Sequence, residues 1–137
     1  MVLHIPRGVI DEIYSHAKRT YPEECCGFLL GFADTTTVIR SRDAINSAPS
    51  RLNRYSIDPR TIMLVENMAR EEGITIIGYY HSHPDHPAVP SEFDRAHAWP
   101  DISYLIVKVV QGEPDGFASW MLQLDGSRFV RQSVRIQ

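Results

Sequence analysis

The chain has 137 residues, of which 43% are hydrophobic and 23% charged, as in ordinary globular proteins. This length is enough for one core, so we expect a single domain over residues 1–137. The 14 basic and 17 acidic residues give a net charge of −3, which argues against a nucleic-acid-binding domain. No apolar run approaches the ~20 residues of a membrane helix, and the first twenty residues do not resemble a signal peptide.

The two cysteines of the chain, Cys25 and Cys26, are adjacent. Neighbours in sequence do not easily adopt disulfide geometry, so we expect two free thiols and a cytoplasmic protein. Either thiol, paired with a histidine, is a candidate nucleophile. The alternative is that both are small hydrophobic residues in an apolar strand.

Helix and strand signals alternate through the first third of the chain. Apolar residues recur at helical spacing over Pro6–Thr20, which predicts a helix that Pro22 ends. The apolar run Cys26–Phe32 predicts a buried strand, with Thr37–Arg42 as its hairpin partner. Polar residues over Asn46–Tyr55 predict a loop.

The middle of the chain predicts helix, strand, loop and helix in turn. Asp58 is the expected N-cap of a helix that runs to Gly73. The β-branched and aromatic run Ile74–His81 predicts a strand. Prolines at every third position argue against regular structure over Ser82–Pro90, and Ser91–Ala98 is predicted to be a short helix with Ser91 as its N-cap.

Three further strands complete the predicted order of elements: Tyr104–Val110, Ala118–Asp125 and Arg128–Ile136. Turn residues that include Pro114 and Gly116 separate the first two of these strands. The resulting order, α-β-β-α-β-α-β-β-β, predicts an α/β or α+β fold with a mixed, largely antiparallel sheet and flanking helices.

Chemistry-bearing residues concentrate between positions 81 and 94. His81 and His83 end a predicted strand, where residues i and i+2 project to the same face and can bind one metal ion. Asp94 follows on the next helix and can supply a third ligand, as in catalytic zinc sites with two histidines and a carboxylate. The pair of histidines alone is a weak signal, and Ser91 and Asp94 also match a helix capping box. His86 is interpreted as a residue outside the site.

Hydrolysis at such a metal centre needs a general base. Glu23 and Glu24, which precede the first apolar strand, are the candidates. Without further context, both also fit solvated charges at the entrance of a strand. His97 is interpreted as a helix-surface residue, with an indirect role beside Asp94 as the alternative.

The combined pattern resembles the JAMM motif of the MPN-domain zinc metallopeptidases, particularly their small prokaryotic branch. The motif is a glutamate in an E-x-C-G context, then H-S/T-H-P, then S-x-x-D, and every part is present in order. The resemblance implies one zinc ion per chain bound by His81, His83 and Asp94. It further implies that Glu24 is the general base and that the hydroxyl of Ser91 stabilises the oxyanion. The implied fold is cytidine-deaminase-like, with a curved mixed sheet.

The resemblance also implies a substrate. Small bacterial members of the family act at the C-terminal tail of ubiquitin-like sulfur carriers of the ThiS/MoaD type, and we expect such a carrier as substrate and partner. The segment 46–57, which contains Arg51, Arg54 and Tyr55, is the candidate groove wall or an ordinary surface loop. The alternatives are a peptidase or isopeptidase for another protein or a cell-wall or phage peptide, and a catalytically silent MPN scaffold. A cupin-like metal site fits poorly with the predicted helices.

Overall fold

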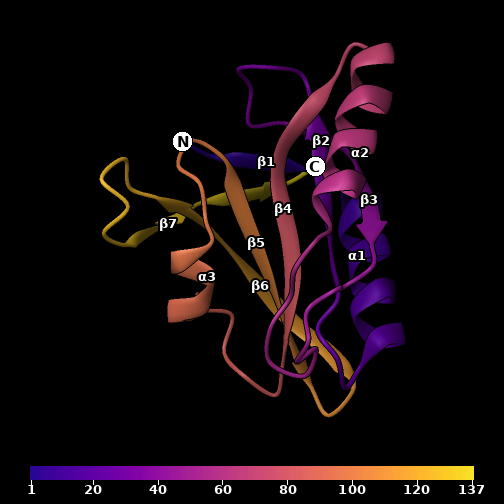
Figure 1. Cartoon of the computed structure of the whole chain (residues 1–137), viewed down its shortest axis with the longest axis vertical. Coiled ribbons are helices and arrows are strands. Elements are labelled where there is room, and N and C mark those ends of the chain that lie inside the picture. The colour runs from indigo at the N-terminus through magenta and orange to yellow at the C-terminus, as the bar shows by residue number, and fades with distance from the viewer.

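The computed structural model describes all 137 residues and confirms a mixed α/β fold with a mostly antiparallel sheet (Figure 1). None of its helices is long and apolar enough to cross a membrane. The helices are α1 (Arg7–Thr20), α2 (Pro59–Glu71) and α3 (Glu92–Ala96). The strands are β1 (Leu3–Ile5), β2 (Cys26–Gly31), β3 (Val38–Ala44), β4 (Thr75–Pro84), β5 (Ser103–Val110), β6 (Glu113–Leu122), β7 (Phe129–Gln132) and β8 (Val134–Ile136).

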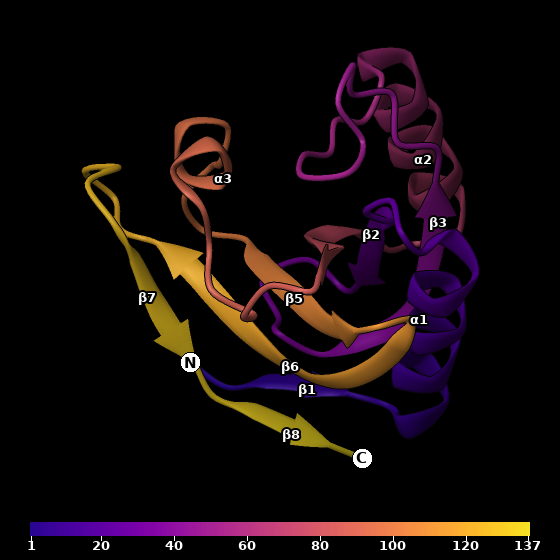
Figure 2. The same cartoon turned by 90° about the horizontal axis from the view of Figure 1, so that it is seen from below.

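The main sheet has the strand order β3-β2-β4-β5-β6-β7. Its neighbours are antiparallel except β4 and β5, which run parallel and are joined by the crossover that contains α3. The sheet is curved, and the parallel pair β1–β8 lies against the face opposite to α2 and α3 (Figure 2). Strand β4 is therefore central, and the crossover that contains α3 starts at its carboxyl end.

Two apolar clusters fix the helices on opposite faces of the sheet. The larger cluster packs α1 and β1 against side chains such as Leu29, Tyr80 and Leu105. The smaller cluster packs Val65 and Ala69 of α2 against the other face. Strand β2 is buried along its whole length because both faces are covered, which explains its nearly continuous apolar sequence.

The two long helices were predicted within a few residues because local signals mark their ends. The carboxylate of Asp58 accepts a hydrogen bond from the backbone of Arg60, as an N-cap does. Glu72 is the C-cap of α2, and Gly73 follows it at a φ of 75°, a conformation that suits glycine. Pro6 is the N-cap of α1 rather than its first helical residue.

The observed strands correct the sequence-based expectations in four places. Strand β4 continues to Pro84 instead of ending three residues earlier, because it pairs with β5 along this whole stretch. Strand β6 begins at Glu113, since Pro114 still pairs with Val109 and a register shift accommodates the residues that follow. The expected last strand is two strands, β7 and β8, which pair in different sheets, and β1 was not predicted.

Candidate metal centre and active site

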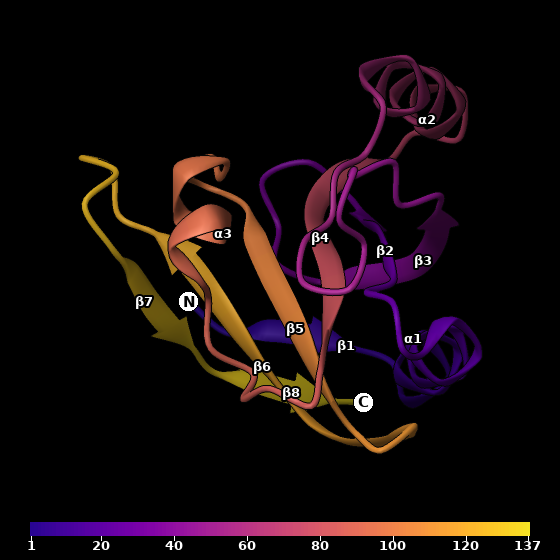
Figure 3. The same cartoon turned by 60° about the horizontal axis from the view of Figure 1, so that its bottom comes forward.

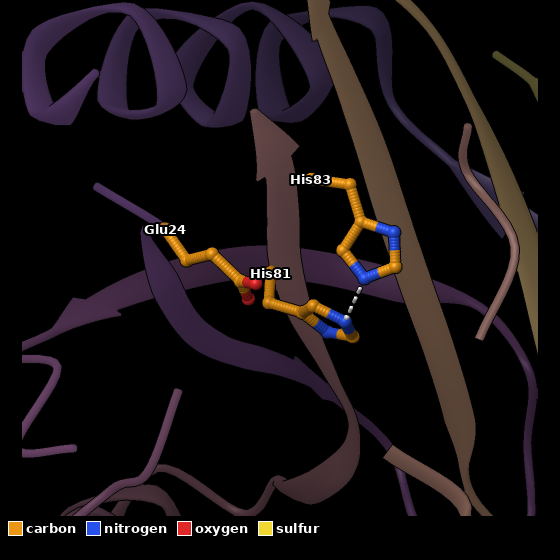
Figure 4. Close-up of side chains that lie close together, drawn as sticks. All are labelled: Glu24, His81 and His83. Carbon is orange, nitrogen blue, oxygen red and sulfur yellow. Dashed lines mark hydrogen bonds between the residues drawn. The ribbon is translucent and has the colours of Figure 1, made fainter. Parts of the chain in front are cut away.

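The carboxyl end of β4 carries the two histidines of the H-x-H pair. His81 and His83 are both buried and, two residues apart on one strand, face the side of the sheet that bears α2 and α3. Strand β2 begins opposite this point, because Cys26 pairs with His81. Glu24 lies just before that strand, and its carboxylate approaches both imidazoles (Figure 4).

Asp94 of α3 completes a compact triangle with the histidines. Its Oδ2 atom lies 3.3 Å from Nε2 of His81 and 3.2 Å from Nε2 of His83, and the two Nε2 atoms are 3.2 Å apart. A tetrahedral zinc ion with bonds of ~2.0–2.1 Å requires ligand atoms about 3.3 Å from one another. The three donor atoms therefore have the spacing of one face of a tetrahedral zinc site.

The chemistry of the donor set also fits zinc. Two imidazoles and one carboxylate are borderline and hard ligands that zinc accepts, and three ligands leave one position open. Hydrogen bonds orient the donors: Nδ1–H of His83 donates to the carbonyl of Pro87 over 2.8 Å, which leaves Nε2 of that ring free to bind a metal. Nδ1 of His81, in contrast, has no hydrogen-bond partner.

The pKa values of the three donors reflect burial and mutual contact. Burial lowers the pKa of His81. For His83, burial also favours the neutral ring, but hydrogen bonds to Asp94 and to the carbonyl of Pro87 raise its pKa above the ordinary value. Contacts of its carboxylate with both imidazoles hold the pKa of Asp94 well below its usual range despite burial. The Asp94 carboxylate is therefore ionised at neutral pH.

Glu24 and Glu23 differ sharply although they are neighbours. Glu24 is 4% exposed, its Oε1 atom has no hydrogen-bond partner, and burial raises its pKa to about 8. Glu23 instead forms a 3.1 Å ion pair with Arg51 at the surface. A general base needs a pKa near the working pH and access to the reacting water. The geometry thus favours Glu24 over Glu23.

Ser91 and Asp94 form a capping box, so the structural interpretation of S-x-x-D is correct. The backbone N–H of Asp94 donates to Oγ of Ser91 over 3.0 Å, and the backbone N–H of Ser91 donates to Oδ2 of Asp94 over 2.9 Å. This arrangement is compatible with the chemical interpretation. It orients Oδ2 toward the histidines and leaves the hydroxyl hydrogen of Ser91 free to donate.

The segment 46–57 between β3 and α2 crosses over β4 and contacts the centre (Figure 3). Tyr55 stacks on His81 with ring centroids 4.3 Å apart. The guanidinium of Arg54 lies 4.6 Å from the centre of the Phe93 ring on α3. The carbonyl of Arg51 accepts a hydrogen bond from the backbone of Glu24. The segment named as a candidate groove wall therefore covers the centre from the side opposite α3.

The other residues singled out in the sequence lie outside the triangle. Burial raises the pKa of Cys25 to about 11 and that of Cys26 to about 12, so both remain thiols and neither suits a nucleophile. His97 stacks on Phe93, and its Nδ1–H donates to the carbonyl of that residue. His86 is exposed on the loop after β4.

One structural contact of the site had no signal in the sequence. Nε1–H of Trp120 on β6 donates to the carbonyl of Ala88 over 3.0 Å. The neighbouring carbonyl, that of Pro87, is the one that accepts from His83. Because these partners are backbone atoms on a loop 32 residues from Trp120 in sequence, no motif could have indicated them.

Comparisons with known proteins place this geometry in a family. Residues 6–123 match the model of the prokaryotic homologues of the JAB domain. The chain is 36% identical over 111 residues to a desampylase of Haloferax volcanii (77% of this chain, 76% of that protein). It is 34% identical over 106 residues to a probable TtuB-protein conjugate cleaving protease of Thermus thermophilus (77% and 70%).

Solved structures agree with the sequence comparisons. A protein from Desulfitobacterium hafniense superposes with a TM-score of 0.85 at 29% identity over 100% of this chain and 93% of that one. A JAB1/MPN domain protein from Archaeoglobus fulgidus shares the fold, with a TM-score of 0.59 at 20% identity over 96% and 97% of the two chains. The match to the family model covers most of the chain, which therefore belongs to the prokaryotic JAB-domain family.

Proposed function

We propose that the protein is a zinc-dependent peptidase that hydrolyses a peptide or isopeptide bond at the C-terminal tail of a ubiquitin-like sulfur carrier. The triangle of two Nε2 atoms and one Oδ2 atom with 3.2–3.3 Å edges, beside a buried carboxylate, carries the proposal. Two relatives support the proposed class of substrate, because one is named a desampylase and the other a probable TtuB-protein conjugate cleaving protease.

His81, His83 and Asp94 would hold the zinc ion, which when bound lowers the pKa of a water ligand and polarises the scissile carbonyl. Glu24 takes the proton from the attacking water and returns it to the leaving amine. Its pKa of about 8 in the metal-free protein suits this exchange, although a nearby cation favours its ionised form. The hydroxyl of Ser91 donates a hydrogen bond to the oxyanion, an interaction worth ~3 kcal/mol.

To test this proposal, the purified protein is incubated with a sulfur carrier whose C-terminus is joined to a short peptide or to a lysine side chain. Mass spectrometry follows cleavage with zinc and with chelator, and elemental analysis measures bound zinc. We expect one zinc per chain and cleavage that chelator abolishes. Glu24→Gln should retain zinc and lose cleavage, Glu23→Gln should retain both, and His83→Ala should lose both.

The outcomes separate the alternatives. An intact carrier in the presence of bound zinc would refute the carrier as substrate and leave another peptide or protein. Cleavage that persists in Glu24→Gln would overturn the assignment of the base. A chain that binds no zinc and cleaves nothing would instead be the silent scaffold.

A further inference from the structure

A cavity of about 360 Å³ opens beside the metal centre, and Asp94 forms part of its wall. One side is the segment 46–57, and the other is the region of α3 and the residues that follow it. Five aromatic side chains line it: Tyr55, Tyr79, Phe93, Trp99 and Tyr104. A cavity of this size with mainly apolar walls has the character of a site for an organic group.

Trp99 is the least buried of these aromatic residues. The residue is 71% exposed, while its backbone N–H donates to the hydroxyl of Tyr104 over 2.8 Å and fixes the chain at the cavity wall. Tyr104 in turn stacks on Tyr79, with ring centroids 6.0 Å apart. A large aromatic side chain exposed at the mouth of a cavity is available to cover an apolar ligand.

The rim of the cavity carries a guanidinium without a carboxylate partner. Arg54 stacks on Phe93 but forms none of the ion pairs of the structure. Its N–H groups are therefore free to donate to carbonyl groups of a peptide that crosses the rim. The cavity thus combines an apolar interior with a hydrogen-bond donor at its entrance.

A second cavity, lined by Glu24, has a different character. It shares no lining residue with the first, and polar side chains that include His16, Asp43 and Arg51 line it. In the proposed reaction Glu24 protonates the leaving amine, so the amine side of the scissile bond lies toward this polar cavity. The acyl side then lies toward Asp94 and the aromatic cavity.

Resting on the proposed peptidase function, we propose that the aromatic cavity is a specificity pocket for a bulky apolar side chain of the substrate. This side chain belongs to the acyl side of the scissile bond and lies close to it, because Asp94 belongs both to the wall of the cavity and to the triangle of candidate ligands. Trp99 and Phe93 are the specificity-determining walls. The protein therefore selects tails with a leucine-sized or larger apolar residue there.

The experiment uses zinc-loaded protein and sulfur carriers with a C-terminal extension. Each of the three positions before the scissile bond is set in turn to Gly, Leu or Phe, and kcat/KM is measured by mass spectrometry. We expect Leu or Phe to exceed Gly by roughly tenfold at one position. Trp99→Ala should remove most of this preference, whereas Leu124→Ala, which removes another exposed apolar side chain that does not line the cavity, should retain it.

A binding measurement separates this proposal from the peptidase proposal. Calorimetry measures how zinc-loaded Glu24→Gln, with and without Trp99→Ala, binds tail peptides that carry either Leu or Gly at the preferred position. If no carrier is cleaved, so that no position is preferred, each of the three positions is tested in this way. Cleavage without a size preference, or a preference only on the amine side, would overturn the pocket and leave the peptidase standing. Absence of cleavage, with binding of the Leu peptide that Trp99→Ala abolishes, would refute the carrier as substrate and retain the pocket. Equal binding of both peptides would refute the pocket.

Discussion

The buried carboxylate of Glu24 makes a prediction that is independent of any substrate. In the metal-free protein its pKa rises from the ordinary 4.5 to about 8 because of burial. A folded-state pKa above the unfolded-state pKa contributes stability below pH ~4.5, and that contribution is lost as the pH rises toward about 8. We therefore expect replacement by the neutral isostere, Glu24→Gln, to make the metal-free protein more stable at neutral pH.

The magnitude follows from the two pKa values. At pH 7 the unfolded chain has released the Glu24 proton and the folded chain largely retains it, over an interval of about 2.5 pH units above 4.5. Each unit corresponds to ~1.4 kcal/mol, so the titration of Glu24 alone lowers the stability of the wild type by about 3 kcal/mol between pH 4 and pH 7. Glu24→Gln has no carboxyl group at this position and therefore does not lose this stability as the pH rises. The difference between the two proteins should therefore grow by about 3 kcal/mol between pH 4 and pH 7.

Urea denaturation of chelator-treated protein at several pH values measures this difference. Glu23→Gln is the matched control, because it removes the same charge at the adjacent but surface-exposed position. The free energy of unfolding of this control should stay within about 0.5 kcal/mol of the wild-type value at each pH. A wild type and a Glu24→Gln variant with parallel pH profiles would show that Glu24 is ionised in the metal-free protein, and the argument from burial would fail.

Three further changes test contacts around the centre. Trp120→Phe removes the donor to the carbonyl of Ala88 and should weaken zinc binding about tenfold in a competition with a chromophoric chelator; an unchanged affinity would mean that the loop needs no such support. Ser91→Ala removes both the N-cap of α3 and a hydroxyl donor. We expect kcat to fall ~100-fold and the free energy of unfolding to fall by ~1 kcal/mol. A kcat equal to that of the wild type would exclude the oxyanion role. Tyr80→Phe leaves Nδ1 of buried His16 without its 2.7 Å partner and should lower the free energy of unfolding by about 1–3 kcal/mol in urea denaturation; an unchanged free energy would show that this hydrogen bond does not stabilise the fold.

The sequence indicated most of the secondary structure where local chemistry determines it. Asp58 begins α2 through its own side chain, and the same holds for Ser91 and α3. Strand boundaries were less accurate because partners distant in sequence determine them. Pro114 marks a turn in most sequences but here pairs with β5, and the residues Leu3–Ile5 form a strand only because β8 lies beside them.

In the candidate site, too, local chemistry could be predicted from the sequence, whereas contacts between distant segments could not. The residues of the motif were named because each carries its own chemistry at a fixed spacing, and the structure brings His81, His83 and Asp94 within 3.3 Å of one another. The aromatic cavity could not be predicted, because its walls come from segments that are far apart in the sequence, such as those of Tyr55, Tyr79 and Phe93. Tyr55 was named only as part of a groove wall, and its stacking on His81 depends on the path of the whole segment 46–57.

Helix α3 joins the stability of the fold to the proposed binding of metal. It has five residues, none of them buried, so apolar packing contributes little to its position. The capping box of Ser91 and Asp94 stabilises its first turn. A hydrogen bond from Arg95 to the carbonyl of Gly126 and the contacts of Asp94 with both histidines hold it against the rest of the fold. Since Oδ2 of Asp94 belongs both to the capping box and to the triangle of candidate ligands, a bound ion would fix the helix directly. The same ion would thereby order one wall of the aromatic cavity, through Phe93 on that helix.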